Sequence, residues 1–500
     1  MASLVVWLVF AKSLAFVVSL ILPLLLVRRL SQSEFGSYKQ AFLVIGTAIS
    51  VLPLGFGTST FYFLPREDKL EAQKQIIFNV VLFNFLVGAL VFLLLWMRSD
   101  LFSLLFHDSK LVGSEVLIGS VVLFWIFSSF LETIAIANQE AKIASIFIFG
   151  AQLSKAILFL VAALLFGTIY SLIVAALVHA VIQTLVLLCY LNIRFRGFWL
   201  SFDWSMLRRQ LSYALPYGAT ALLFVVQTDL HNYFVANRFD AATFAIYSIG
   251  CLQLPFLGIL TESLASAMIP RLSLLQKENN KREIVILMTR IMRKLAIVHF
   301  PLYAFLMING RDFIRWLFTD AYAKSWPIFA VNLTLIPFYV IMLDPIVRAY
   351  AEQRYFLVRL RLILSAVLIV SLFFAIRFFG PLGVIVVVVS INLFEHFVIT
   401  WRSAQLVGFE KRDVRLLSDV GKLALAALTG ALATLITRPL VMGLSPFYVL
   451  VMTGTVFLIF YIGIIFLWKV PTPLERAVLT KRISVLERVW FWKRTAEPSV

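Results

Sequence analysis

Two ten-residue stretches decide the fold predicted for this chain: RLSQSEFGSY at Arg29–Tyr38 and RFDAATFAIY at Arg238–Tyr247. Each stretch places an arginine, a phenylalanine, a small residue and a tyrosine at the same spacing, and the two arginines are 209 residues apart. Two tripeptides follow in the same order, Leu64-Pro65-Arg66 and then Ile269-Pro270-Arg271, at an offset of 205 residues. Two matched patterns in one order favour an internal duplication over chance agreement.

The composition is typical of an integral membrane protein. Hydrophobic residues make up 61% of the chain and charged residues 14%, and the mean hydropathy is +0.95. Apolar runs of roughly 20 to 25 residues recur, the length that crosses a hydrocarbon slab of about 30 Å as a helix. We therefore predict an all-α polytopic membrane protein with fourteen spans. They lie at 4–27, 38–63, 76–96, 114–137, 143–166, 170–191, 211–235, 241–269, 291–309, 327–347, 357–378, 382–401, 423–442 and 446–468.

The basic residues indicate which way the helices cross. The chain has 44 lysines and arginines and a net charge of +18. If the N-terminus is cytoplasmic, 31 of these residues fall in inward loops and the tail, and 11 in outward loops. Such asymmetry is typical of the positive-inside rule and of attraction to anionic lipid, so we expect both termini to be cytoplasmic and no binding of nucleic acid.

The offset between the repeats predicts the architecture. It spans six crossings, an even number, so the second copy enters the membrane in the same direction as the first. We predict two parallel six-helix bundles related by a pseudo-twofold axis along the membrane normal, with a central cavity at their seam. The predicted parts are the first bundle at 1–191, a cytoplasmic linker at 192–210, the second bundle at 211–401, helices thirteen and fourteen at 402–468, and a cytoplasmic tail at 469–500 that forms an amphipathic surface helix or a solvated one.

No catalytic constellation, nucleotide-binding loop or metal-spaced cluster stands out in the sequence, and so we expect no enzyme active site, no metal and no cofactor. Cys189 and Cys251 lie inside apolar runs and are predicted to be packing residues. The informative residues are ionisable groups within apolar helices. Such groups are costly at membrane depth and usually face an aqueous cavity.

Three cations are candidates for binding an anionic substrate. Lys155 lies near the middle of the run 143–166, with Gln152 one turn earlier on the same helical face; the alternative is a lysine paired with a carboxylate or carbonyl inside the bundle. Lys12 lies in the first helix and either faces the cavity or snorkels inward. Arg29 ends that helix, where it either anchors the helix end or takes part in binding or gating.

A second set of residues is predicted for ion coupling or gating. Asp229 and His231 lie with Gln227 and Asn232 in a polar cluster of the seventh run, where they either titrate during transport or form an internal hydrogen-bonded network. Three carboxylates near inward helix ends complete the set: Glu132, Glu262 and Glu395.

Several segments resemble landmarks of one family. VRRLSQSEFGSYKQ at Val27–Gln40 resembles the first-loop signature of bacterial polysaccharide and O-antigen flippases, which belong to the multidrug/oligosaccharidyl-lipid/polysaccharide (MOP) exporter superfamily. FYFLPR at Phe61–Arg66, IPRLS at Ile269–Ser273 and FGPLG at Phe379–Gly383 are similar to further landmarks in the same order. Ala245 departs from the pattern, because the family usually has glycine there, which questions how closely the two copies mirror each other.

The resemblance implies a MATE-like fold and the translocation of undecaprenyl-diphosphate-linked oligosaccharide across the bacterial inner membrane by alternating access, for O-antigen, capsule or exopolysaccharide synthesis. It also implies contact with membrane lipids, and with a polysaccharide polymerase and a chain-length regulator as further partners. One alternative is a MATE-like exporter of drugs or other lipids. The alternative from another class is a membrane glycosyltransferase or polymerase, which usually needs a larger outward loop than this chain offers.

Overall fold

The computed structural model describes residues 2–98, 100–106, 109–341 and 343–470. These residues form α-helices and short 3-10 helices joined by turns, with no strand among them. The chain divides into two compact units. The first consists of Met1–Leu252, Leu317–Asn332 and Val358–Ile391, and the second of Gln253–Trp316, Leu333–Leu357 and Asn392–Val500.

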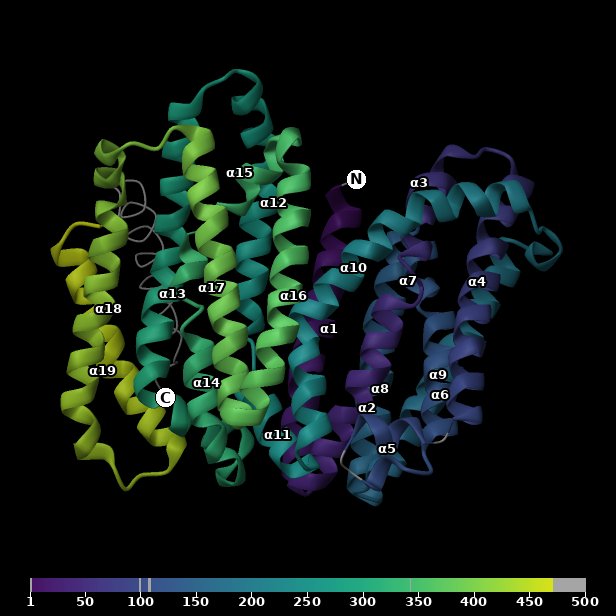
Figure 1. Ribbon diagram of the computed structural model, residues 1–500, viewed down its shortest axis with the longest axis horizontal. Coiled ribbons are helices and arrows are strands. Elements are labelled where there is room, and N and C mark those ends of the chain that lie inside the picture. The colour runs from purple at the N-terminus through teal and green to yellow at the C-terminus, as the bar shows by residue number, and fades with distance from the viewer. Residues whose placement is uncertain (1, 99, 107–108, 342, 471–500) are drawn as a thin grey trace, which may run out of the picture. The chain divides into compact units, whose positions relative to one another are not determined.

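The first unit begins with a long series of helices. They are α1 (Ala2–Arg29), α2 (Gln32–Val51), η1 (Phe56–Thr58), α3 (Ser59–Phe63), η2 (Leu64–Arg66), α4 (Leu70–Met97), α5 (Leu101–Leu105), η3 (Ser109–Leu111), α6 (Glu115–Ser128), α7 (Phe130–Ala137), α8 (Ala141–Leu165), α9 (Ile169–Arg194), η4 (Phe198–Leu200), α10 (Trp204–Arg238) and α11 (Ala241–Gly250). The long helices α4, α6, α8 and α9 run alongside one another, with α4 against α6, α6 against α9 and α9 against α8 (Figure 1). In addition, α1 packs along α8.

The remaining elements are divided between the two units. They are α12 (Pro255–Lys277), α13 (Lys281–Phe318), η5 (Asp320–Ser325), α14 (Trp326–Leu333), η6 (Phe338–Val340), α15 (Asp344–Ala349), η7 (Ala351–Gln353), α16 (Arg354–Phe378), α17 (Gly380–Val407), η8 (Lys411–Leu417), α18 (Ser418–Thr437), η9 (Arg438–Val441) and α19 (Pro446–Leu467). In the second unit α18 packs along α19, and α12 contacts α15. The predicted tail helix falls in 471–500, outside the described residues.

Eleven of the fourteen predicted spans have counterparts in the structure. Ten helices in the described part of the chain are long and apolar enough to cross a membrane, and the bent pair Gln32–Val51 with Phe56–Arg66 makes eleven. The remaining three predicted runs are interrupted or more polar. The run 241–269 breaks at 251–254 between α11 and α12, and the run 327–347 divides into α14, η6 and α15. The run 211–235 lies inside α10, which is long enough to span but carries the polar cluster around Asp229.

The two landmark stretches adopt the same local conformation. Ser31 caps α2 by accepting a hydrogen bond from the Glu34 amide, and Asp240, at the matching position, caps α11 by accepting one from the Thr243 amide. The phenylalanine and tyrosine of each stretch are buried. The duplication inferred from sequence therefore corresponds to two helices that start in the same way.

These two landmark helices also pack against each other. A Cβ placed on Gly36 would lie 1.8 Å from the carbonyl oxygen of Ala241, the first residue of α11. Only a residue without a side chain allows α2 and α11 to approach so closely. Position 36 therefore requires glycine in this packing, whereas Ala245 is accommodated, fully buried, at the matching position of the second copy.

The second landmark differs between the copies. Leu64-Pro65-Arg66 forms η2 after a break in which Leu54 and Gly55 have φ angles of 50° and 65°, and the helices on either side are inclined by 42°. Ile269-Pro270-Arg271 lies inside the continuous helix α12. The two copies thus share the start of the module but not its end.

Candidate functional site

Lys155 lies among three aromatic rings. Its Nζ is 4.8 Å from the ring centroid of Trp125 on α6, 5.7 Å from that of Phe159 on α8 and 5.8 Å from that of Phe42 on α2. The Phe42 ring contacts those of Trp125 and Phe159, with centroid distances of 5.9 and 5.5 Å. We call Phe42, Trp125 and Phe159 the aromatic cage. It offers the ammonium the negative faces of three rings.

The predicted alternative for Lys155, a carboxylate or carbonyl partner, is not found among the described residues, where no ion pair or hydrogen bond includes the side chain of this lysine. Cation–π contact is worth about 0.5–2 kcal/mol, much less than the cost of withdrawing an ammonium from water. The Lys155 charge is therefore incompletely compensated, and an anion that reached Nζ would gain from it.

His179 on α9 fixes the position of the cage tryptophan. The indole N–H of Trp125 donates to His179 Nδ1 at 3.0 Å, and His179 Nε2 lies 3.0 Å from the carbonyl oxygen of Ala151. Because an indole can only donate and a carbonyl can only accept, His179 carries its proton on Nε2 and is neutral. Ala151 lies one turn before Lys155 on α8, so the histidine joins three helices around the lysine.

Lys12 and Glu132 form an ion pair with a distance of 2.8 Å between Nζ and Oε1. Their side chains are 57% and 45% exposed, and they come from α1 and α7. The sequence predicted a substrate contact for the lysine and a coupling role for the carboxylate, and the structure brings the two together. An exposed pair of this kind contributes about 0–1 kcal/mol, so only a small free energy holds Lys12 to Glu132.

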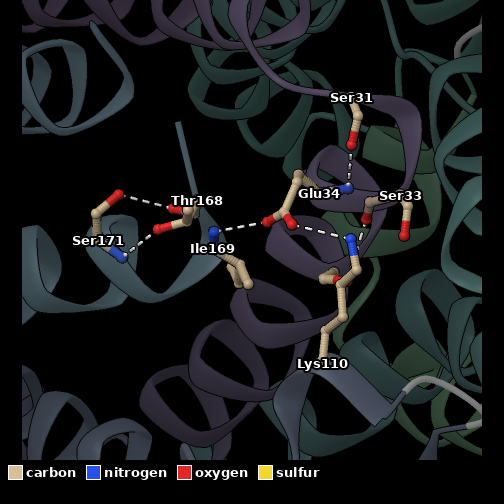
Figure 2. A network of polar contacts seen from close by, with 8 residues as sticks. Ser31, Ser33, Glu34, Lys110, Thr168, Ile169 and Ser171 are labelled. Carbon is tan, nitrogen blue, oxygen red and sulfur yellow. Dashed lines mark hydrogen bonds and ion pairs between the residues drawn. The ribbon is translucent and has the colours of Figure 1, made fainter. Parts of the chain in front are cut away.

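Arg29 is the exposed last residue of α1, and the matching Arg238 is the exposed last residue of α10. The residues that follow Arg29 have a structural role, as Figure 2 shows. Glu34 accepts hydrogen bonds from Lys110 Nζ at 2.9 Å and from the amide of Ile169, the first residue of α9, at 2.7 Å. The signature stretch thus connects the start of α2 to η3 and to the start of α9.

The polar cluster of α10 divides into two environments. His231 is buried, and its Nδ1 lies 2.7 Å from the hydroxyl of Tyr247, the landmark tyrosine of α11. This contact is a hydrogen bond inside the first unit, of the kind expected if the cluster forms an internal hydrogen-bonded network. Asp229 is half-buried and forms no ion pair with any described residue.

Two predicted carboxylates belong to the second unit. Glu395 lies on α17 and is half-buried. Glu262 lies on α12, but its side chain is outside the described residues. Lys155, Lys12, Arg29, Asp229, His231 and Glu132 all belong to the first unit.

Sequence reasoning missed the aromatic cage and His179 as its support. Phe42, Trp125 and Phe159 lie in apolar runs, where an aromatic residue is expected whether it packs, faces lipid or surrounds a cation. The one available signal was Lys155 itself, because a charged residue at that depth needs some compensating group.

Comparisons with known proteins identify the family and the fold of this chain. The family model described as "Polysaccharide biosynthesis protein" matches residues 25–327. The chain belongs to this family. The predicted membership of a polysaccharide biosynthesis family is thereby confirmed. No curated protein matches the chain.

Solved structures confirm the predicted fold class for this polysaccharide biosynthesis protein. The lipid II flippase MurJ in an inward closed conformation has a TM-score of 0.69 at 14% identity, over 92% of this chain and 98% of that one. An inward-facing multidrug resistance MATE family transporter of the MOP superfamily has a TM-score of 0.57 at 15% identity, over 80% and 94% of the two chains. A MATE transporter from Vibrio cholerae has a TM-score of 0.52 at 14% identity, over 83% and 99%. At these identities the likeness shows the fold alone.

Proposed function

We propose that this protein translocates an undecaprenyl-diphosphate-linked oligosaccharide across the bacterial cytoplasmic membrane for surface polysaccharide synthesis, and that Lys155 binds the diphosphate. The observation that carries the proposal is the partly uncompensated ammonium in the aromatic cage of a chain that belongs to a polysaccharide biosynthesis family. Lysine is a compact point charge suited to phosphate oxygens. The similarity of fold to a structure named as a lipid II flippase supports a lipid-linked cargo.

The polar headgroup of such a cargo is difficult to move across a bilayer. Each sugar hydroxyl that enters hydrocarbon without a hydrogen-bond partner costs roughly 2 to 7 kcal/mol, so the glycan needs a polar route while its lipid tail stays in the bilayer. We propose that two parallel six-helix bundles, 1–191 and 211–401, provide that route by alternating access. Both termini are proposed to be cytoplasmic, in agreement with the distribution of basic residues.

The proposed energy source is the membrane potential. Export of each negative charge through a potential negative inside contributes about 2.3 kcal/mol per 100 mV, so an anionic diphosphate can leave without a coupled ion. In sealed vesicles, dissipation of the potential should slow flipping of the lipid-linked glycan, while collapse of the pH gradient should not. The reverse result would favour proton antiport through Asp229, the half-buried carboxylate of α10.

The direct test replaces the caged ammonium. Lys155→Met keeps most of the side-chain volume and removes the charge, Lys155→Arg keeps the charge, and Lys324→Ala removes an exposed cation from η5 as the control. Charge-assisted hydrogen bonds contribute about 1.5–3 kcal/mol, so Lys155→Met should lower the flipping rate in proteoliposomes roughly ten-fold or more. An unchanged rate in Lys155→Met at equal protein abundance would remove the binding role of Lys155.

A further inference from the structure

The segment between α9 and α10 carries a concentrated group of exposed large apolar side chains. We call residues 195–204 the linker segment. Trp199, Leu200, Phe202 and Trp204 are 50%, 84%, 49% and 69% exposed. They follow immediately after Arg194, where the apolar helix α9, a candidate membrane span, ends. The exposed aromatic group is therefore positioned at the end of a span, where a helix leaves the hydrocarbon.

Two buried phenylalanines of the linker segment anchor its backbone to the hydrophobic core. Phe195 and Phe198 are 2% and 4% exposed and belong to the same hydrophobic core as Ile77 and Val80 of α4. Gly197 has a φ of 82°, a left-handed conformation that forms a turn between the two buried phenylalanines. The outward side chains are therefore exposed because their backbone is anchored, and not because the segment lacks packing.

Polar contacts fix the far end of the linker segment. The buried side chain of Asn79 on α4 donates to the backbone carbonyl of Asp203 at 3.0 Å and to Gln210 Oε1 at 3.3 Å. The Asp203 carboxylate in turn accepts from the Met206 amide and caps α10. Asp203 is the only acidic residue in 192–210, and its carboxylate is used in this cap.

The charges around the aromatic group are positive. Arg196, Arg208 and Arg209 are exposed, and no ion pair or hydrogen bond of their side chains occurs among the described residues. Arg194 differs, because it pairs with Glu140 at 2.7 Å. Three cations without partners beside exposed tryptophans match the chemistry of a bilayer interface with anionic headgroups. There, tryptophan rings lie at headgroup level and arginines meet phosphate.

We propose that the linker segment and the first turns of α10 form a membrane-interface anchor that binds anionic phospholipid, with Trp199 and Trp204 inserted at headgroup level and Arg196, Arg208 and Arg209 on the phosphates. The proposal goes beyond the transport function and does not depend on which substrate the protein carries. It assigns the segment between the proposed bundles a lipid ligand, so that its position relative to the membrane surface stays fixed.

The first test measures lipid binding by the full chain. Arg196→Gln, Arg208→Gln and Arg209→Gln are combined in one variant, and a control variant removes the same charge elsewhere, with Lys277→Gln, Lys411→Gln and Arg415→Gln. In detergent, phosphatidylglycerol is titrated against phosphatidylcholine and retained lipid is measured by native mass spectrometry. Each arginine near a lipid surface contributes roughly five-fold in affinity, so the linker variant should lose on the order of 100-fold in phosphatidylglycerol affinity relative to wild type. Equal losses in the two variants would overturn the specific role of these arginines.

The second test locates the tryptophans. The chain has 11 tryptophans, so the fluorescence of Trp199 and Trp204 is obtained as the difference between wild type and the double variant Trp199→Phe, Trp204→Phe in nanodiscs that contain phosphatidylglycerol. This difference should be quenched by lipids brominated near the headgroup and little by aqueous acrylamide. Strong quenching by acrylamide would place the linker segment in water, which would overturn the anchor and favour a protein partner.

Discussion

Replacement of Gly36 by alanine should disrupt the packing of the two landmark helices. The Cβ of an alanine at position 36 would lie 1.8 Å from the Ala241 carbonyl oxygen and 2.4 Å from its carbonyl carbon, both backbone atoms of α11. Cβ atoms essentially never approach other heavy atoms within 3.0 Å, so α2 and α11 would have to separate by about 1.2 Å. A backbone atom cannot turn aside as a flexible side chain can.

The cost of this separation follows from the packing it disturbs. Forced overpacking of a close-packed interior costs about 1–3 kcal/mol, and the clash of a side chain with a rigid backbone favours the upper end of that range. Gly46 on the same helix is the matched control, because a Cβ there meets nothing within 4 Å. Alanine is a better helix former than glycine by about 0.5–1 kcal/mol, so Gly46→Ala should be neutral or stabilising.

The assay is the thermal unfolding of both variants in the same detergent, followed by glycan export in cells at matched abundance. Gly36→Ala should lower the apparent unfolding temperature by about 1–3 °C relative to wild type, and Gly46→Ala should not lower it. Equal unfolding temperatures for Gly36→Ala and wild type would refute the close crossing of α2 and α11. A similar loss in both variants would show that helix α2, and not its contact with α11, is the sensitive feature.

Two further predictions concern polar pairs in the first unit. Lys12→Ala should impair glycan export without lowering protein abundance. The charge swap Lys12→Glu with Glu132→Lys keeps the ion pair but moves the ammonium, so export should stay impaired because the ammonium at position 12 contacts substrate. Normal export in the charge-swap variant would assign the lysine to the ion pair alone. Tyr247→Phe should lower the free energy of unfolding by about 1–3 kcal/mol, because it leaves the buried Nδ1 of His231 without its partner at 2.7 Å. An unchanged temperature of thermal unfolding would count against that hydrogen bond.

Much of the fold could be predicted because lipid restricts what a sequence can do. A span needs a long apolar run, and eleven of the fourteen predicted runs correspond to helices, or a bent helix pair, of suitable length and composition. Two of the three others contain breaks that hydropathy averaged over a window does not detect, such as 251–254 between α11 and α12. The third, 211–235, lies inside the continuous helix α10 but carries a polar cluster.

The candidate site could be predicted only in part. Lys155 was found because a charge is conspicuous in an apolar run, and Lys12 for the same reason. The cage around Lys155 joins residues from three helices, and its aromatic members are indistinguishable in sequence from the many others in a chain with 47 phenylalanines and 11 tryptophans. The pairing of Lys12 with Glu132, 120 residues apart, is likewise set by the packing of helices far apart in sequence.

The sequence by itself determined that this is a helical membrane protein with an internal repeat, since both follow from local properties: hydrophobic length and the spacing of a few landmark residues. The tertiary structure alone decided which groups surround each charge, and therefore which charges remain available for a ligand. The physical reason is that compensation of a charge depends on distances of a few ångströms between helices, and those distances arise only when the helices pack.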